Sequence, residues 1–192
     1  MSGNRTFLGY RRPSGRAGTR NHLLILGING LVASAARRIA SLLPGTKLVA
    51  TPYGRGQLGP DKDLHTAQLI GLGANPNVGA VIVVGADRRT AETIAQGITD
   101  RAAKPVEVWT LDDTDEDALE LVSRAVRAGG RLTRDISRLR REPVALSELF
   151  LGIECGHSDA TSGIAGNPLA GSLADRLVDA GGTVVVGETL EW

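Results

Sequence analysis

The sequence of 192 residues has little that could cross-link it or hold it in a membrane. It contains one cysteine and only six aromatic residues, two each of Trp, Tyr and Phe. One cysteine cannot form a disulfide within the chain, which favours a reducing compartment. The longest apolar run, residues 23–36, is interrupted by Asn29 and Ser34. It falls short of the roughly 20 residues needed to cross a bilayer, so we expect no membrane partner.

The chain also lacks an excess of charge of one sign. Its 22 basic and 21 acidic residues are interspersed and give a formal net charge of +1. A nucleic-acid-binding domain would concentrate basic residues on one face, so this class is not expected. The first twenty residues are polar and rich in Gly and Arg, unlike a secretory signal peptide. The composition therefore predicts a cytoplasmic protein whose core is built mainly from Ala, Val, Leu and Ile.

From residue 22 onward, strand-like and helix-like patterns alternate. The apolar runs of strand length are residues 22–28, 47–53, 80–85, 106–111, 149–153 and 183–187. Helical spacing is found in residues 31–43, in 61–70 after a possible N-cap at Asp61, and in residues 90–101, 112–127 and 168–180. Such alternation predicts an α/β fold, layered and Rossmann-like, with a mainly parallel sheet flanked by helices.

Three segments are expected from this pattern. Residues 1–21 show no periodicity and are predicted to be an arm. Residues 22–140 form the α/β domain. The charged residues 128–148 are predicted to be an irregular helical connection or a linker. Residues 141–192 begin a second catalytic domain.

Parallel sheets gather ligands at the carboxyl ends of their strands, so the loops that follow the strands are the candidate sites. The loop at residues 154–167 has the densest set of polar groups, with two carboxylates, a thiol, an imidazole, hydroxyls and an amide. Pro168 suits the first turn of a helix whose free N–H groups favour an anion such as a carboxylate or sulfonate. The alternative is a tight loop whose side chains satisfy its own backbone, with Cys155 as a small buried hydrophobe.

Three separated motifs resemble one known family. YRRPSGRAGTRN near the N-terminus, YGRGQLGPD after the second strand, and LGIECGHSDATSGIAGNPLAG near the C-terminus resemble the altronate dehydratase and galactarate dehydratase family. The large subunit of (2R)-sulfolactate sulfo-lyase is similar to the same motifs. The resemblance spans nearly the whole chain.

The resemblance implies metal-assisted β-elimination from a sugar acid such as altronate or galactarate, with iron(II) or manganese(II) as the divalent ion. It also implies a separate β-clip (SAF) subunit as partner and a homo-oligomer. No nucleotide cofactor is expected, because the G-x-x-G after the first strand lacks the third glycine of a dinucleotide fingerprint.

The positions that match the family motifs are the candidate site residues. The expected catalytic residues are Glu154, His157 and Asp159; the expected substrate-binding residues are Arg16, Arg20, Asn21, Gln57, Ser158, Ser162 and Asn167; the expected metal ligands are Cys155 and Asp61. For Arg20 a structural ion pair remains open, and for Gln57 and Asp61 turn formation and helix capping. We expect Arg20, Gln57 and the C-terminal loop to converge on one site.

The sequence also departs from the family pattern. Thr51 and Arg55 stand where many relatives have His and Cys, and Ala86-Asp87-Arg88 replaces Gly-Cys-Glu. A thiolate-rich metal site is therefore not expected, and Arg55 and Arg88 are predicted to add positive charge at the site. Family catalytic subunits continue beyond the point where this sequence stops. The alternatives to a hydro-lyase component are thus a sulfo-lyase subunit acting on sulfolactate and a non-catalytic binding or assembly domain.

Overall fold

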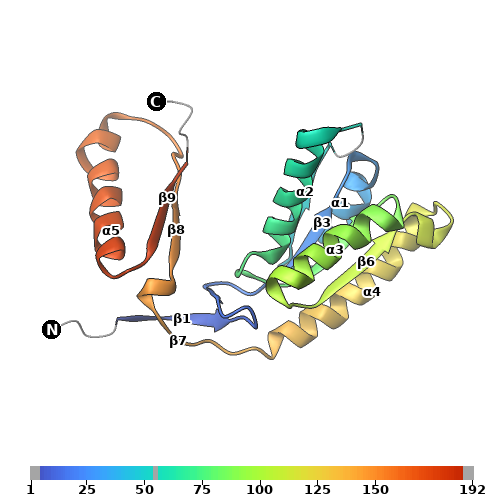
Figure 1. The fold of residues 1–192 in the computed structure, drawn as a ribbon, viewed down its shortest axis with the longest axis horizontal. Helices are drawn as coiled ribbons and strands as arrows, with labels where there is room; N and C mark the ends of the chain where they lie inside the picture. Colours follow the sequence, from blue (N-terminus) through green and yellow to red (C-terminus); the bar gives the residue numbers. More distant parts are fainter. Residues whose placement is uncertain (1–4, 54–55, 188–192) are drawn as a thin grey trace. The chain divides into compact units, whose positions relative to one another are not determined.

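The structure is a computed structural model that describes residues 5–53 and 56–187 (Figure 1). The chain divides into two compact units. The larger unit is Tyr10–Arg141, and the smaller unit combines Met1–Gly9 with Glu142–Trp192.

A four-stranded parallel sheet forms the centre of the larger unit. Its strands are β3 (His22–Gly27), β4 (Lys47–Ala50), β5 (Val78–Gly85) and β6 (Val106–Thr110), in the spatial order β4-β3-β5-β6. The helices that connect and follow them are η1 (Gly30–Val32), α1 (Ala33–Leu42), α2 (Gly59–Ala74), α3 (Arg88–Ala102), η2 (Asp112–Thr114) and α4 (Ala118–Ser137). The side on which successive strands are added changes at β3, because β4 lies on one side of β3 and β5 on the other. All four strands remain parallel.

Helices cover both faces of this sheet. Helices α1 and α4 pack with one face of β3 and β5, whereas α2 and α3 pack with the other (Figure 1). All eight residues of β5 are buried, which explains its unbroken apolar sequence. The predicted α/β class and the mainly parallel sheet are confirmed, while the more specific likeness to a Rossmann fold stays a prediction.

Two segments that the sequence analysis treated as irregular are regular in the structure. The predicted arm contains β1 (Thr6–Arg11) and β2 (Ala17–Gly18), which pair as an antiparallel hairpin at Tyr10 and Arg11. Helix α4 continues ten residues past the predicted end at residue 127 and buries Ala128, Leu132 and Ile136 against the sheet. The helical character expected from residue 128 is confirmed as far as Ser137, whereas the expected irregularity was wrong there, because the apolar stripe continues through the charged segment.

Helix α2 also begins differently from the prediction. It starts at Gly59, with Leu58 at the N-cap position and Pro60 in the first turn. Asp61 therefore lies inside the first turn rather than at the N-cap. There its carboxylate still interacts favourably with the helix dipole.

The smaller unit is built around two short parallel strands, β8 (Phe150–Ile153) and β9 (Thr183–Val186). Between them lie the π-helical turn η4 (Ser162–Gly166) and α5 (Asn167–Asp179), and Gly181 adopts a positive φ of 85° where the chain turns back into β9. Before β8, β7 (Glu142–Ala145) pairs antiparallel with residues 6–9 and is followed by η3 (Leu146–Glu148).

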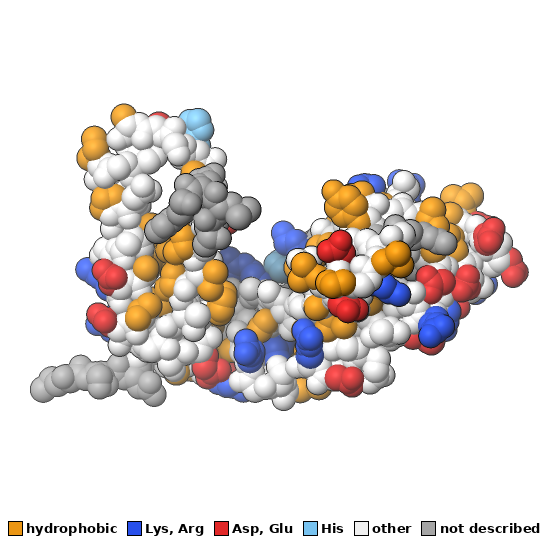
Figure 2. Space-filling model, turned by 45° about the horizontal axis from the view of Figure 1, so that its top comes forward, with side chains coloured by type: hydrophobic (Ala, Val, Ile, Leu, Met, Phe, Trp, Pro, Cys, Tyr) orange, Lys and Arg blue, Asp and Glu red, His pale blue; other side chains and the backbone are white. Residues whose placement is uncertain are grey.

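Apolar side chains remain exposed on this unit. Phe150, Leu169, Leu173 and Val185 are among them, and hydrophobic side chains are visible on its surface in Figure 2. Among residues 5–53 and 56–187, no helix is both long enough and apolar enough to cross a membrane.

Lys104 is a buried cation in the larger unit and gives the stability of the chain a predictable pH dependence. Its Nζ donates to the carbonyl oxygens of Asn75 (2.7 Å) and Val78 (2.8 Å), and only 5% of the residue is exposed. Burial, and secondly the charge of Arg12, lower the pKa of Lys104 from 10.5 to about 7. Between pH 7 and 10.5 the unfolded chain therefore binds more protons than the folded chain, so the free energy of unfolding should rise with pH.

Lys104 is expected to raise the free energy of unfolding by at most about 1.4 kcal/mol for each pH unit between pH 7 and 10.5. Urea denaturation of the wild type and of Lys104→Met at pH 7 and pH 9.5 measures this increase. The difference between the two proteins should grow at the higher pH in favour of the wild type. Lys62→Met, at an exposed position, should show no such change, and a constant difference for Lys104→Met would contradict the prediction.

Candidate functional site

The N-terminal motif forms a structural network around Arg12. This residue is 4% exposed, and its guanidinium donates to the carbonyl oxygens of Pro76 (2.7 Å) and Arg20 (3.0 Å) and to Oδ1 of Asn21 (2.9 Å). The amide nitrogen of Asn21 in turn donates to the carbonyl of Ile136 at 2.8 Å. Both ends of the Asn21 amide are therefore engaged within the protein. Sequence reasoning gave Arg12 no role, and only the motif itself could have singled it out.

Arg20 and Arg16 remain exposed. The Arg20 guanidinium donates to the carbonyl of Thr19 (3.1 Å), and its backbone N–H donates to the side-chain oxygen of Asn77 (3.0 Å). Its guanidinium is thus accessible to an anion, as an anchoring role requires. The hydrogen bonds found for it do not include the structural ion pair that had been the alternative.

The structure does not bring Arg20 and Gln57 together. Arg20 and Asn21 precede β3, whereas Gln57 follows the neighbouring parallel strand β4. They lie at opposite ends of the sheet, separated by the length of β3, about 20 Å for six residues. The expected convergence of these residues on one site was wrong, because Arg20 precedes its strand, Gln57 follows its strand, and the two strands are parallel. Individual roles for Arg16, Arg20, Asn21, Gln57 and Asp61 stay predictions.

Two side-chain oxygens near the carboxyl ends of β3 and β4 are buried without a partner among the described residues. They are Oδ1 of Asn29, a residue that is 3% exposed, and Oε1 of Gln57. Leaving such an acceptor unpaired costs about 1–3 kcal/mol. Asn29 was absent from the predicted site residues. Its position directly after a buried strand was the available signal.

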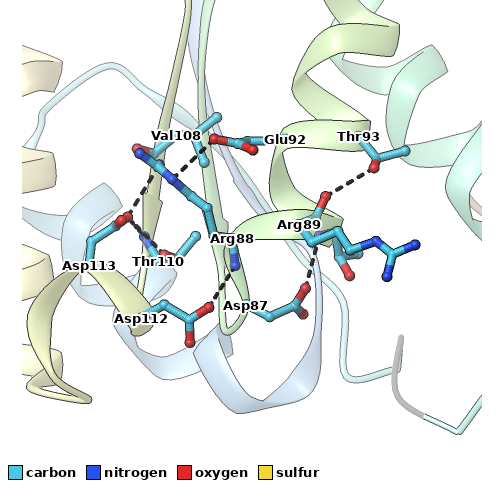
Figure 3. Close-up of polar contacts among 10 residues, drawn as sticks. Asp87, Arg88, Arg89, Glu92, Thr93, Val108, Thr110, Asp112 and Asp113 are labelled. Carbon is cyan, nitrogen blue, oxygen red and sulfur yellow. Dashed lines mark hydrogen bonds and ion pairs between the residues drawn. The ribbon is translucent and has the colours of Figure 1, made fainter.

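At the carboxyl ends of β5 and β6, Arg88 lies among carboxylates (Figure 3). Its guanidinium pairs with Glu92 (3.1 Å) and Asp113 (3.3 Å), and its backbone N–H donates to Asp112 (2.9 Å). Asp113 also accepts from the backbone and hydroxyl of the buried Thr110. The charge of Arg88 is therefore balanced locally, which corrects the expectation that it makes the site more positive. Arg55 lies outside the described residues.

The loop at residues 154–167 is organised by Asp159. Its Oδ1 accepts from the hydroxyl (2.6 Å) and the backbone N–H (2.7 Å) of Thr161, and its own N–H donates to Oγ of Ser162 (3.0 Å). The hydrogen bond from the Thr161 hydroxyl, followed by that from its N–H, lowers the pKa of Asp159. The carboxylate is thus held in the charged form. This bonding also fits the alternative of a loop that satisfies itself.

The other predicted residues of this loop are accessible from solvent. Glu154, Cys155, His157, Ser158 and Asn167 are all exposed, so the alternative of Cys155 as a buried hydrophobe was wrong. The Cys155 sulfur lies 3.8 Å from Oγ of Ser158. The Glu154 carboxylate lies against Gly187, which follows β9. The loop therefore gathers the predicted residues of the C-terminal motif in one part of the smaller unit.

A metal ion implied by the family resemblance does not fit the described residues as they stand. Among residues 5–53 and 56–187, no group of three or more His, Cys, Asp or Glu side chains is placed to hold one. Metal-ligand roles for Cys155 and Asp61 stay predictions. We therefore derive no catalytic step through a metal.

Comparison with known proteins identifies the relatives of both units. Residues 9–137 match the family model described as D-galactarate dehydratase/altronate hydrolase, second domain, and residues 146–192 match the one described as D-galactarate/altronate dehydratase, C-terminal.

Characterised relatives are similar along almost the whole chain. The (2R)-sulfolactate sulfo-lyase subunit beta of Chromohalobacter salexigens is 43% identical over 97% of this chain and 47% of its own length. Altronate dehydratase of Bacillus subtilis is 33% identical over 98% of this chain and 39% of its own length. Galactarate dehydratase (L-threo-forming) of Escherichia coli is 29% identical over 97% of this chain and 39% of its own length. The chain thus spans less than half the length of these relatives.

Proposed function

Because this chain belongs to the D-galactarate dehydratase/altronate hydrolase family, we propose that it forms part of a lyase that eliminates a β-substituent from a polar 2-hydroxy acid. The observation that carries the proposal is that relatives named as dehydratases and as a sulfo-lyase subunit align with at least 97% of the chain. These names share one reaction type. In it, the C2–H bond and the bond from C3 to the leaving group break, and the enol that forms becomes a 2-oxo acid.

Two leaving groups are possible within this reaction type. The motifs predicted a hydro-lyase that releases water from altronate or galactarate. The higher identity to the sulfo-lyase subunit, 43% against 33% and 29%, favours sulfolactate and the release of sulfite. A third candidate, a non-catalytic assembly domain, is supported by the exposed apolar side chains of the smaller unit.

The C-terminal loop supplies the proposed acid–base groups. Asp159 is held as a carboxylate by its two hydrogen bonds from Thr161. A carboxylate can accept a proton or position a cationic or hydroxyl group, but it cannot donate a proton. Glu154 and His157 are exposed to substrate and are the proposed groups for transfer of the C2 proton and for assistance to the leaving group. The expected free helix start at Pro168 was wrong, because the helical segment begins at residue 160 and the N–H of Asn167 donates to the carbonyl of Ser162. The side chains of Ser158, Ser162 and Asn167 are instead the proposed contacts for the acidic end of the substrate.

The proposed assembly includes further chains. The name of the Chromohalobacter protein describes a subunit, which indicates a multi-subunit relative. For the present chain we propose a β-clip (SAF) subunit and a homo-oligomer. On the basis of the family resemblance we also propose iron(II) or manganese(II) as the divalent ion.

An elimination assay tests the proposed function. The chain is incubated with (2R)-sulfolactate, altronate or galactarate, with and without iron(II) or manganese(II), and 2-oxo acid and sulfite are measured. Formation of a 2-oxo acid is expected, and Asp159→Asn should lower its rate about 100-fold or more. Asp175→Asn, at an exposed position of α5 outside the loop, is the matched control and should keep the wild-type rate. A folded chain that converts none of the three acids under any of these conditions would refute the proposal.

A further inference from the structure

We propose that Asn29, together with Gln57, accepts hydrogen bonds from hydroxyl groups of the bound acid at the carboxyl end of the parallel sheet. The inference rests on the proposed function for the class of ligand. It assigns to the larger unit a binding role for residues that are not part of the C-terminal loop.

Two side-chain amide oxygens of the larger unit are buried and unpaired within the part of the chain that the structure describes. Oδ1 of Asn29 and Oε1 of Gln57 are shielded from water and have no partner among the described residues. Asn29 occupies the N-cap position of η1, where an asparagine oxygen normally accepts from a backbone N–H of the first turn. Its side chain makes no such bond. The acceptor therefore remains free although a local partner is close in sequence.

Asn29 lies at a position in the fold where open α/β sheets bind ligands. It follows β3, the strand at which the order β4-β3-β5-β6 reverses. After β3 the chain enters α1 on one face of the sheet, and after β5 it enters α3 on the other. Diverging loops of this kind leave a crevice at the carboxyl ends of the strands, which is where open α/β sheets bind ligands.

The loops after β3 and β4 are in direct contact with each other. The N–H of Gly30 donates to the carbonyl of Tyr53 at 3.0 Å. A side chain at Gly30 would meet the carbonyl oxygen of Pro52 at 2.5 Å, so this close approach requires glycine. The ring of His65, on α2, lies 3.5 Å from the carbonyl of Ile28, beside Asn29 in the chain. The segment that follows β3 is thus in contact with both the β4–α2 loop and α2.

The unpaired oxygens of Asn29 and Gln57 determine which chemical groups of a ligand they can bind. An amide oxygen accepts hydrogen bonds and offers nothing to a carboxylate or sulfonate oxygen, so the groups it binds are donors. The proposed substrates all carry hydroxyl groups, which can donate to Asn29 and Gln57. The anionic end of the ligand must then be held by other residues.

Replacing Asn29 by leucine separates this proposal from a structural role. Leucine is similar in shape and removes the unpaired oxygen, so Asn29→Leu should raise the midpoint of thermal unfolding without ligand. An asparagine that mattered only for the fold would give a lower midpoint. Gln68→Leu, at an exposed position of α2, is the matched control and should leave the midpoint and the affinity unchanged.

Binding is measured by calorimetry with two pairs of ligands that differ in their hydroxyl groups. The pairs are (2R)-sulfolactate with 3-sulfopropanoate, and galactarate with hexanedioate. The wild type should prefer the hydroxylated member by roughly tenfold, the effect of one hydrogen bond. Asn29→Leu, and independently Gln57→Leu, should reduce this preference while binding of the hydroxyl-free member is unchanged.

Several results would overturn the proposal. They are a lower unfolding midpoint for Asn29→Leu, an undiminished preference for the hydroxylated acid in both variants, and no binding of any of the four acids by the wild type. The elimination assay is independent of these readouts. Preferential binding without turnover would refute only the proposed function, whereas turnover with an unchanged preference in the variants would refute only this inference.

Discussion

Arg12→Ala is expected to lower the free energy of unfolding by about 3 kcal/mol, because each buried acceptor left unpaired costs about 1–3 kcal/mol. The guanidinium bridges the β1–β2 hairpin to the turn at Pro76 and to Asn21 before β3. All of its acceptors are neutral oxygens, so the loss comes from broken hydrogen bonds and not from a broken ion pair. Burial lowers the pKa of Arg12, because it disfavours the charged guanidinium.

Urea denaturation at pH 7 measures this loss. Arg16→Ala, an exposed residue of the same motif, is the control and should change the free energy of unfolding by less than about 0.5 kcal/mol. Arg12→Lys should fall between the two, because an ammonium cannot reproduce the planar fork of the guanidinium. Equal losses for Arg12→Ala and Arg16→Ala would show that the network does not hold the hairpin in place.

Gly18→Ala is expected to destabilise the chain by about 3 kcal/mol, at the upper end of the range for overpacking. Gly18 is buried in β2, and a Cβ there would overlap the carbonyl group of Pro76. That carbonyl already accepts from Arg12 at 2.7 Å, so it cannot retreat without weakening this bond. The clash is with backbone and not with the end of a flexible side chain, so the hairpin itself has to move.

Gly130→Ala is the matched control for Gly18→Ala. Gly130 lies within α4, where an added Cβ meets nothing within 4 Å. Alanine favours the helix over glycine by about 0.5–1 kcal/mol, so this variant should be more stable than the wild type. Denaturation curves for the two alanine variants should therefore shift in opposite directions, and a shift of Gly18→Ala toward higher stability would contradict the packing described here.

The elements of the larger unit were predictable where apolar periodicity is strong. Strand β5 and helix α3 were found within two residues at each end, because their burial patterns repeat along the chain. The β1–β2 hairpin was missed, since its two strands contribute few buried apolar residues. It is held by polar contacts to residues more than fifty positions away, such as those of Arg12 with Pro76 and Thr19 with Asn77.

The candidate site was likewise predictable from the sequence only in part. The motifs placed Asp159 and Ser162 in one loop correctly, because residues three apart in a turn remain neighbours. The opposite positions of Arg20 and Gln57 already followed from the predicted parallel sheet, since one precedes its strand and the other follows its strand. The sequence could not show that Glu92 and Asp113 neutralise Arg88, because that depends on which loops become adjacent after folding.

The sequence by itself therefore determined the α/β class and the family, since hydrophobic periodicity and motif spacing are properties of neighbouring residues. Only the tertiary structure decided which polar groups are satisfied. It paired Arg12 with three neutral oxygens from distant segments and left the Asn29 oxygen without a partner among the described residues. The physical reason is that desolvation and hydrogen bonding act between groups brought together by the fold, whatever their separation in the chain.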